Sequence, residues 1–308
     1  MPTAEAQTRT QDAADRWSFA LSGGRRLGLD PRPGRALVMG IVNVTPDSFS
    51  DGGLYADPRR AVEHALALAE AGADLLDLGA ESTRPAGETY GKGAAAVDAD
   101  EEWRRLEPVL VALREATPLP LSVDTRKGEV AQRALAAGAD LVNDVTALSD
   151  PALAEAVAAA GCPVVLMHSR GDTATMKDRA VYRDVAAEVR DELAAALAGA
   201  EAAGIDRDRT ILDPGLGFAK TAEQSLELLA RLDLLAGLGR PLLVGASRKS
   251  FLGTASGVEA PAERVAGSLA AAVWAAERGA AMLRVHDVAE TVQALAVLRA
   301  LAAAEETA

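Results

Sequence analysis

A short apolar run leads into a polar loop in the stretch Leu37-Val-Met-Gly-Ile-Val-Asn-Val-Thr-Pro-Asp-Ser-Phe-Ser-Asp-Gly-Gly53. The run from Leu37 to Val42 predicts a buried strand that ends at the amide side chain of Asn43. α/β proteins build ligand sites where a buried strand delivers a polar side chain to its carboxyl end. An ordinary strand-to-helix turn explains this stretch equally well, so the rest of the chain decides between the two.

Aliphatic runs of the same kind alternate with Ala-rich segments of helical periodicity along the whole chain. Runs that are apolar throughout are typical of parallel strands buried on both faces. Eight such units favour a (β/α)8 TIM barrel over an open doubly wound sheet. The first run is not followed by a Gly-x-Gly-x-x-Gly fingerprint, which weighs against a dinucleotide-binding fold. The eight runs lie near Leu37–Val42, Asp74–Leu78, Leu119–Val123, Asp140–Val142, Pro163–Met167, Thr210–Leu212, Pro241–Val244 and Ala281–Val285.

Helix boundaries are marked in the segments between these runs. Asp57-Pro58 and Asp150-Pro151 place a capping residue before a proline at the first helical position. Thr221-Ala-Glu-Gln224 has the spacing of a capping box. A glycine falls where each of several helices should end in a left-handed cap: Gly72, Gly138, Gly161, Gly204, Gly239 and Gly279.

The amino-terminal residues differ in character from the alternating part. Residues 1–16 are polar and lack the apolar core of a signal peptide, so we expect a flexible tail. Gly23-Gly24, between two short runs, predicts a hairpin that closes the bottom of the fold. No low-complexity linker follows, so residues 17–308 are predicted to form a single barrel domain.

The net charge of −13, from 32 basic and 45 acidic residues, gives no general attraction to nucleic acid or to an anionic membrane. No apolar run has the length of a membrane span, and a cytoplasmic protein is expected. The single cysteine, Cys162, lies in an apolar run and excludes a disulfide within the chain. It is predicted to be buried and inert, because no basic residue adjoins it in sequence.

Polar side chains follow every predicted strand. In a barrel the active site lies at the carboxyl ends of the strands, so these residues are predicted to surround one cavity. Each has a simpler explanation by itself, since polar residues end strands and cap helices. The strand ends carry Asn43, Glu81-Ser-Thr-Arg-Pro85, Asp124-Thr-Arg126, Asn143-Asp144, Met167-His-Ser-Arg170, Asp213-Pro-Gly215, Ser247-Arg-Lys-Ser250 and Arg284-Val-His-Asp287.

These strand-end residues divide by charge. Two carboxylates and an amide offer acceptors that suit a planar heterocycle rich in N–H groups: Asp124, Asn143 and Asp213. A basic group on so acidic a chain points to an anionic ligand such as phosphate or diphosphate: Arg248, Lys249, Arg284 and His286. The alternatives are a helix cap for Asp124, a plain turn for Asp213, and a surface ion pair with Asp287 for Arg284 and His286.

Two loops complete the predicted site. Segments 43–53 and 81–93 are rich in Gly, Pro, Ser and Thr and are long enough to close over a cavity. Phe49 is a large apolar residue within the first loop, where it is positioned to cover an aromatic substrate or to anchor its own loop.

The chain resembles the dihydropteroate synthase family from about Leu37 to the final helix. The residues that carry the resemblance are Asn43-Val-Thr-Pro-Asp-Ser-Phe-Ser-Asp-Gly-Gly53, Glu81-Ser-Thr-Arg-Pro85, Ser122-Val-Asp-Thr-Arg126, Asn143-Asp144, Leu166-Met-His168, Leu212-Asp-Pro-Gly-Leu-Gly-Phe218, Gly245-Ala-Ser-Arg-Lys-Ser-Phe251 and Arg284-Val-His-Asp287. The resemblance implies a TIM-barrel transferase, usually a homodimer, that joins 6-hydroxymethyl-7,8-dihydropterin diphosphate to 4-aminobenzoate with Mg²⁺ present. One departure is Ala86, which stands where the family pattern has glycine directly after Arg84-Pro85.

Residue roles follow from the resemblance motif by motif. It implies pterin contacts from Asp124, Asn143, Met167, Asp213, Phe218 and Lys249. It implies diphosphate contacts from Arg248, Arg284 and His286, and a magnesium ligand in Asn43. It implies 4-aminobenzoate contacts from Phe49, Thr83, Arg84, Pro85, Lys220 and Ser250. Asp51 is expected near the reacting carbon and forms the implied catalytic set with Arg84 and Lys249.

Three other functions remain open at the level of sequence. A folate-dependent methyltransferase of related barrel type shares the acceptor residues but does not need Arg284 and His286. A silent pterin-binding paralogue would keep the fold without the synthase activity. A Schiff-base aldolase acting on a phosphosugar would use Lys249 as its nucleophile.

Overall fold

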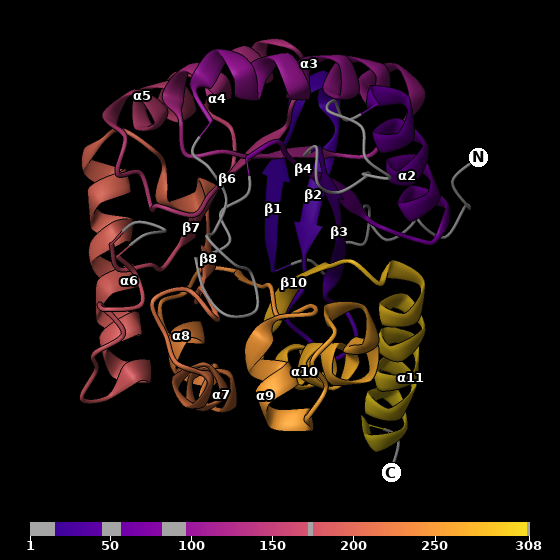
Figure 1. The fold of residues 1–308 in the computed structure, drawn as a ribbon, viewed down its shortest axis with the longest axis vertical. Coiled ribbons are helices and arrows are strands. Elements are labelled where there is room, and N and C mark those ends of the chain that lie inside the picture. Colours follow the sequence, from indigo (N-terminus) through magenta and orange to yellow (C-terminus); the bar gives the residue numbers. More distant parts are fainter. Residues whose placement is uncertain (1–15, 45–56, 82–96, 172–174, 307–308) are drawn as a thin grey trace.

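The computed structural model of the protein describes residues 16–44, 57–81, 97–171 and 175–306. Within these ranges, eight parallel strands close into a barrel in the order β10-β3-β4-β5-β6-β7-β8-β9. Helices form a ring outside the strands (Figure 1). The predicted (β/α)8 TIM barrel is therefore confirmed. None of the described helices is long and apolar enough to cross a lipid bilayer.

The strands and helices of the described ranges have the following bounds. The hairpin consists of β1 (Trp17–Ala20) and β2 (Arg26–Leu29), joined by the 3-10 turn η1 (Ser22–Gly24). The barrel strands are β3 (Leu37–Asn43), β4 (Leu75–Gly79), β5 (Leu121–Asp124), β6 (Leu141–Asp144), β7 (Val164–Met167), β8 (Thr210–Asp213), β9 (Leu242–Val244) and β10 (Ala280–Val285). The helices are α2 (Pro58–Glu70), α3 (Ala99–Ala116), α4 (Gly128–Ala136), α5 (Pro151–Ala160), α6 (Val185–Ala202), η3 (Arg207–Arg209), α7 (Ala222–Ala230), α8 (Asp233–Ala236), α9 (Ser250–Ser256), η4 (Pro261–Glu263), α10 (Val265–Glu277) and α11 (Val288–Glu306).

Each predicted run became a strand with boundaries within two residues of the prediction. Several strands run one or two residues further at the carboxyl end than their apolar residues do, because the parallel ladder continues through the polar positions. Asn43, for example, pairs with Gly79, and Asp124 pairs with Asn143. The polar residues are thus the last members of the strands, which places their side chains at one end of the barrel.

The helix-start signals act as the sequence predicts. The Asp57 and Asp150 side chains accept hydrogen bonds from backbone N–H groups of the first turns of α2 and α5, with proline at the start of each helix. Thr221 and Gln224 form both bonds of a capping box. All six predicted cap glycines have positive φ angles.

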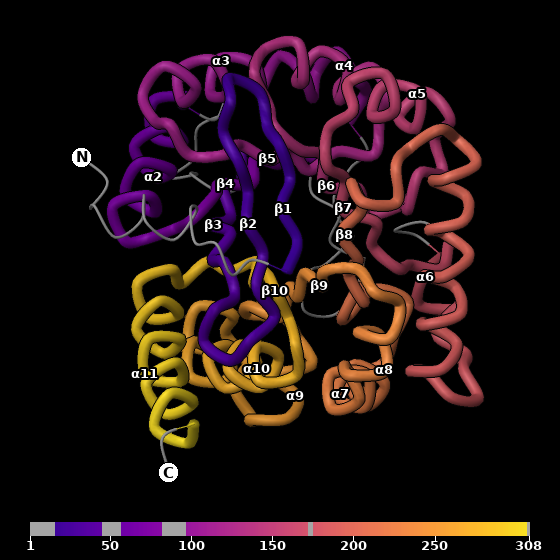
Figure 2. The backbone as a smooth tube through the Cα atoms, turned by 180° about the vertical axis from the view of Figure 1, so that it is seen from behind, coloured from indigo at the N-terminus to yellow at the C-terminus, as the bar shows by residue number. Residues whose placement is uncertain are grey.

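The hairpin closes the amino end of the barrel. Figure 2 shows β1 and β2 lying across the strands on this side. Phe19, Leu27 and Leu29 are buried against apolar side chains from inside the barrel, including Met39 and Met282. The connection is longer than the two residues predicted, because the chain makes a 3-10 turn there and Ala20 pairs with Arg26. The interior below the site is therefore solid, as in packed TIM barrels.

One buried carboxylate fastens the hairpin to the barrel. The side chain of Asp140, at the start of β6, is fully buried. Its oxygens accept hydrogen bonds from Arg25 Nη2 at 2.7 Å, Arg114 Nη1 at 3.1 Å, Ser22 Oγ at 2.9 Å and the Leu121 N–H at 3.0 Å. The guanidinium groups of Arg25, from the turn of the hairpin, and Arg114, from α3, thus share one carboxylate group.

Replacement of this acceptor should destabilise the fold. Asp140→Ala leaves Arg25 and Arg114 partly buried without their carboxylate, so we expect a loss of about 3 kcal/mol in the free energy of unfolding. Urea denaturation followed by circular dichroism measures this loss. Asp191→Ala, which removes an exposed carboxylate paired with Arg190, is the control and should change stability by less than about 0.5 kcal/mol. Equal effects of the two substitutions would contradict the anchoring role of Asp140.

Candidate active site

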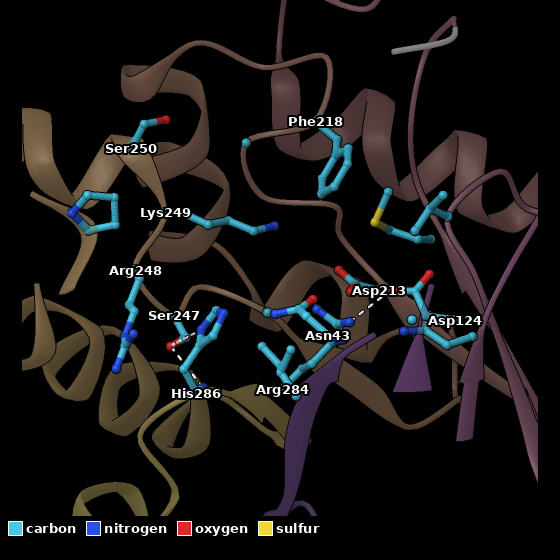
Figure 3. A pocket seen from close by; sticks show the side chains of 18 of the residues that line it. Asn43, Asp124, Asp213, Phe218, Ser247, Arg248, Lys249, Ser250, Arg284 and His286 are labelled. Atoms are coloured by element: carbon cyan, nitrogen blue, oxygen red, sulfur yellow. Dashed lines mark hydrogen bonds and ion pairs between the residues drawn. The ribbon is translucent and has the colours of Figure 1, made fainter. Parts of the chain in front are cut away.

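A cavity of about 380 Å³ opens at the carboxyl ends of the barrel strands. Figure 3 shows the side chains that line it. The structure brings together most of the predicted residues that it describes: Asn43, Asp124, Asn143, Met167, Asp213, Phe218, Arg248, Lys249, Ser250, Arg284 and His286. Polar side chains from many strand ends therefore converge on one cavity. Independent roles as turn residues or helix caps would not bring them together.

Strand register sets the level of these side chains. Asn43 pairs with Gly79, Gly79 with Asp124, and Asp124 with Asn143, so the ends of β3 to β6 lie at one height. Gly79 has no side chain between its two polar neighbours. A Cβ at this position would meet Asp124 at 3.4 Å. The glycine therefore leaves the wall open where Asn43 and Asp124 face the cavity.

Two carboxylates form the acidic part of the wall. Burial raises the pKa of Asp124 to about 7, against the opposing effect of the Arg284 guanidinium. Burial also raises the pKa of Asp213, which Lys249 and the Gly215 N–H counteract. Asp213 Oδ1 accepts that N–H at 2.7 Å. Only glycine fits this turn, because its φ is +64° and a Cβ would lie 1.9 Å from the carbonyl oxygen of His168.

The Arg284 guanidinium lies among carboxylates at the base of the cavity. Its Nη2 donates to Asp124 Oδ2 at 2.8 Å, and its Nε donates to Asp77 Oδ2 at 2.6 Å. Asp77 is fully buried on β4 and also accepts Asn143 Nδ2 at 3.1 Å. Asp77 has no role predicted from the sequence. The available signal was a charged residue within the apolar run Leu75-Leu-Asp-Leu-Gly79.

Lys249 extends across the cavity from the start of α9. Figure 3 shows its ammonium group pointing toward Phe218 and Asp213. The Nζ atom lies 4.6 Å from the centroid of the Phe218 ring and donates to the Leu216 carbonyl oxygen. Burial lowers the pKa of Lys249 to about 8. The cation is thus held between the acidic wall and an aromatic face.

Arg248 and His286 occupy the other side of the cavity. Arg248 has a left-handed backbone, with φ of +59°, and its guanidinium binds Asp287 at 2.5 Å and 3.1 Å. His286 Nδ1 lies 3.1 Å from Ser247 Oγ, which also accepts the His286 backbone N–H at 3.2 Å. Asp287 thus pairs with Arg248, whereas Arg284, for which the sequence left this pair open, bonds to Asp77 and Asp124 instead. Arg248 and His286 both line the cavity. Ser247 was noted as a strand-end residue but was not assigned a role.

Lys220 is not among the residues that line the cavity. Its Nζ donates to His168 Nδ1 at 2.9 Å and to the carbonyl oxygens of Gly215 and Phe218 at 3.0 Å each. These three bonds use all three ammonium protons. His168 Nε2 lies 2.9 Å from Glu192 Oε2, and burial beside Lys220 lowers the pKa of His168 to about 4. In this geometry Lys220 supports the loop that carries Phe218.

The remaining predicted site residues lie outside the described residues: Phe49, Asp51, Thr83, Arg84 and Pro85. Among the described residues, no three His, Cys, Asp or Glu side chains gather in a way that could hold a metal ion. Cys162 is half-buried and not fully buried as predicted, because it lies at the surface end of the segment between α5 and β7. Desolvation nevertheless raises the pKa of its thiol to about 12, which keeps it protonated and supports the prediction that it is inert.

The barrel that carries this cavity matches a known enzyme family. A sequence profile described as pterin binding enzyme matches residues 39–286. The chain belongs to this pterin-binding enzyme family. Dihydropteroate synthase of Escherichia coli strain K12 is 46% identical over 269 residues, which cover 87% of this chain and 93% of that protein. The predicted family resemblance is confirmed.

Solved structures of family members have the same fold. Dihydropteroate synthase of Xanthomonas albilineans with 4-aminobenzoic acid is 53% identical, with a TM-score of 0.83, and covers 91% of this chain and 96% of that one. A second structure from the same organism, in complex with 7,8-dihydropteroate, is 50% identical, with a TM-score of 0.81. That match covers 93% of this chain and 99% of the other.

The raised pKa of Asp124 predicts a dependence of stability on pH. Because the folded pKa of about 7 lies above the unfolded value, Asp124 stabilises the fold at low pH, and this contribution is lost as pH rises toward 7. Relative to Asp124→Asn, the wild type should lose on the order of 1 kcal/mol of unfolding free energy per pH unit between pH 5 and 7. Urea denaturation at several pH values measures the difference. Parallel curves for the two proteins would contradict the raised pKa.

Proposed function

We propose that this protein is a dihydropteroate synthase, which condenses 6-hydroxymethyl-7,8-dihydropterin diphosphate with 4-aminobenzoate to give 7,8-dihydropteroate and diphosphate. One observation carries the proposal. A single cavity holds acceptors on one wall, Asp124 and Asp213, and basic side chains on the other, Arg248, Lys249 and His286, in a chain of net charge −13. A pterin diphosphate has a donor-rich ring and an anionic tail, and so requires both walls.

The acidic wall is proposed to hold the pterin ring. Asp124, Asn143 and Asp213 offer oxygen acceptors to the amino group and ring N–H groups of the pterin. Met167 and Phe218 line the same cavity and give the flat ring apolar contacts. Buried acceptors discriminate strongly, because a ligand without the matching donors leaves them unpaired.

The basic wall is proposed to stabilise the departing diphosphate. Positive groups placed where negative charge develops lower the barrier without reorganisation. His286 lies at the end of β10, while Lys249 and Arg248 approach from the neighbouring loop. Arg284, which shares a strand face with His286, is proposed to add its positive charge from the base of the cavity. The pterin ring delocalises the positive charge left on its exocyclic carbon, and the amine of 4-aminobenzoate then attacks that carbon. This dissociative route is our hypothesis, and it requires no covalent nucleophile.

The second substrate is proposed to bind at the mouth of the cavity. Ser250, at the first position of α9, lines the cavity and is proposed to contact this substrate. The other proposed contacts rest on the motif resemblance: Phe49, Thr83, Arg84 and Pro85 for 4-aminobenzoate, and Asp51 near the reacting carbon. Lys220 is proposed to act indirectly, because its ammonium group holds the carbonyl oxygens of the loop before α7.

Magnesium is proposed to enter with the diphosphate. Mg²⁺ prefers oxygen ligands, keeps several waters, and is commonly held by substrate phosphates with only one or two protein groups. Asn43 fits this pattern, because it brings an amide oxygen to the cavity on the rigid end of β3. The bound ion would supply positive charge to the leaving diphosphate. Asn43 would orient that charge from the barrel wall.

We further propose a cytoplasmic location, in keeping with the absence of a spanning helix among the described residues.

Release of diphosphate in a coupled assay tests the function. We expect steady turnover of pterin diphosphate only when 4-aminobenzoate and Mg²⁺ are both present, and loss of activity with excess chelator. Lys249→Met should lower kcat/KM about 100-fold, because it removes a preorganised cation from the site. Lys177→Met, at an exposed lysine, is the matched control and should retain wild-type activity. No product from wild-type protein with both substrates would leave a silent pterin-binding paralogue.

A homodimer is also proposed. An apolar groove on the outside of the barrel is formed by α7, α9 and α10, with Leu226 and Trp274 exposed by 38% and 41%. Exposed apolar surface of this kind favours association with a second copy. Trp274→Arg should convert the dimer to a monomer in sedimentation velocity experiments. Val297→Arg, at an exposed position on α11, should remain dimeric. A wild-type monomer would refute the proposal.

A further inference from the structure

One buried carboxylate lies beneath the cavity without lining it. Asp77, in the middle of β4, has no exposed surface. Its Oδ2 atom accepts two hydrogen bonds, from Arg284 Nε at 2.6 Å and from Asn143 Nδ2 at 3.1 Å. Both donors belong to residues that line the cavity. Asp77 therefore contacts the site only through other side chains.

The bond to Asn143 determines which way the amide faces. A carboxylate paired with a guanidinium accepts hydrogen bonds and donates none, so the nitrogen of the Asn143 amide must face Asp77. The amide oxygen then points the other way, toward the cavity. An amide turned by 180° would instead present a donor there. The acceptor character of Asn143 is thus fixed by its neighbour and not by the asparagine itself.

The bond to Arg284 keeps the guanidinium in place when a ligand arrives. Arg284 also donates to Asp124 Oδ2 at 2.8 Å. A ligand that takes hydrogen bonds with Asp124 competes for this carboxylate, and a buried guanidinium without a partner is costly. The bond to Asp77 remains available throughout, because Asp77 is out of reach of the cavity.

Stability alone does not account for Asp77. Apolar residues often replace buried ion pairs without loss of stability. Moreover, its second oxygen, Oδ1, has no hydrogen-bond partner among the described residues. Ser122 pairs with Asp77 in the strand register and is equally buried. Its hydroxyl group also has no hydrogen-bond partner among the described residues. A desolvated carboxylate whose two bonds both lead to cavity residues indicates a role in the site.

We propose that Asp77 is a positioning residue that sets the donor and acceptor pattern of the cavity floor. It holds the oxygen of Asn143 toward the ligand and holds Arg284 beside Asp124, so that the floor accepts a ring edge rich in N–H groups. The inference rests on the proposed function, because a pterin is the ligand that supplies this edge. Asp77 thereby contributes to selectivity for the 2-amino pterin ring over rings that carry a carbonyl at that position.

The test compares two ligands that differ at this position. 6-Hydroxymethylpterin carries an amino donor, and 6-hydroxymethyllumazine carries a carbonyl acceptor in its place. Isothermal titration of each ligand gives the ratio of their affinities. In Asp77→Leu the Asn143 amide can turn, so the preference for the pterin should fall about tenfold, equivalent to about 1.4 kcal/mol. Asp77→Asn keeps an oxygen that can accept both bonds and should stay within about threefold of the wild-type ratio.

Ser122→Val is the matched control, because it changes a neighbouring interior side chain that has no described partner. It should retain the wild-type ratio. An unchanged ratio in Asp77→Leu, or equal falls in Asp77→Leu and Ser122→Val, would overturn the inference. If Asp77→Leu lacks a native circular dichroism spectrum, Asp77→Ala replaces it, since a smaller side chain avoids overpacking. Failure of the wild type to bind the pterin would instead overturn the proposed function, and the inference with it.

Discussion

The site depends on a half-buried guanidinium that is held between two carboxylates. Arg284 reaches Asp77 and Asp124 from the opposite end of the sequence, across 207 and 160 positions. Its partners lie on β4 and β5, whereas Arg284 lies on β10, which meets β3 where the barrel closes. The ion pairs can therefore form only in the closed barrel. A cation buried in an acidic chain needs such partners, since its desolvation is otherwise uncompensated.

Local patterns were sufficient to predict the barrel and most of the described cavity. Alternating aliphatic runs and capped helices depend on residues close in sequence, and parallel strands place their carboxyl ends at one edge. Asn43, Asp213 and His286 could be assigned to one cavity by this rule alone, because each follows an apolar run. The resemblance to a known family then supplied chemical roles that spacing cannot give.

Long-range pairing decided what the sequence could not show. Asp77 lies inside a run that looked uniformly structural, and its role depends on Asn143 and Arg284, which are far away in the chain. Lys220 follows Phe218 closely, and the motif alone gives no direction for its side chain. In the structure its ammonium group meets His168, 52 positions earlier. Side-chain direction at a loop is set by such tertiary partners, and neither periodicity nor spacing reports it.

The hairpin at the amino end closes that end of the barrel among the described residues. Phe19, Leu27 and Leu29 pack with the apolar interior and fill the end opposite the cavity. A ligand held at the level of Asp124 therefore enters and leaves at the carboxyl end of the barrel, where the cavity lies. A molecule bound at that opening obstructs the passage of one bound on the floor. The residence time of a ligand on the cavity floor therefore depends on what is bound nearer the mouth as much as on its own contacts.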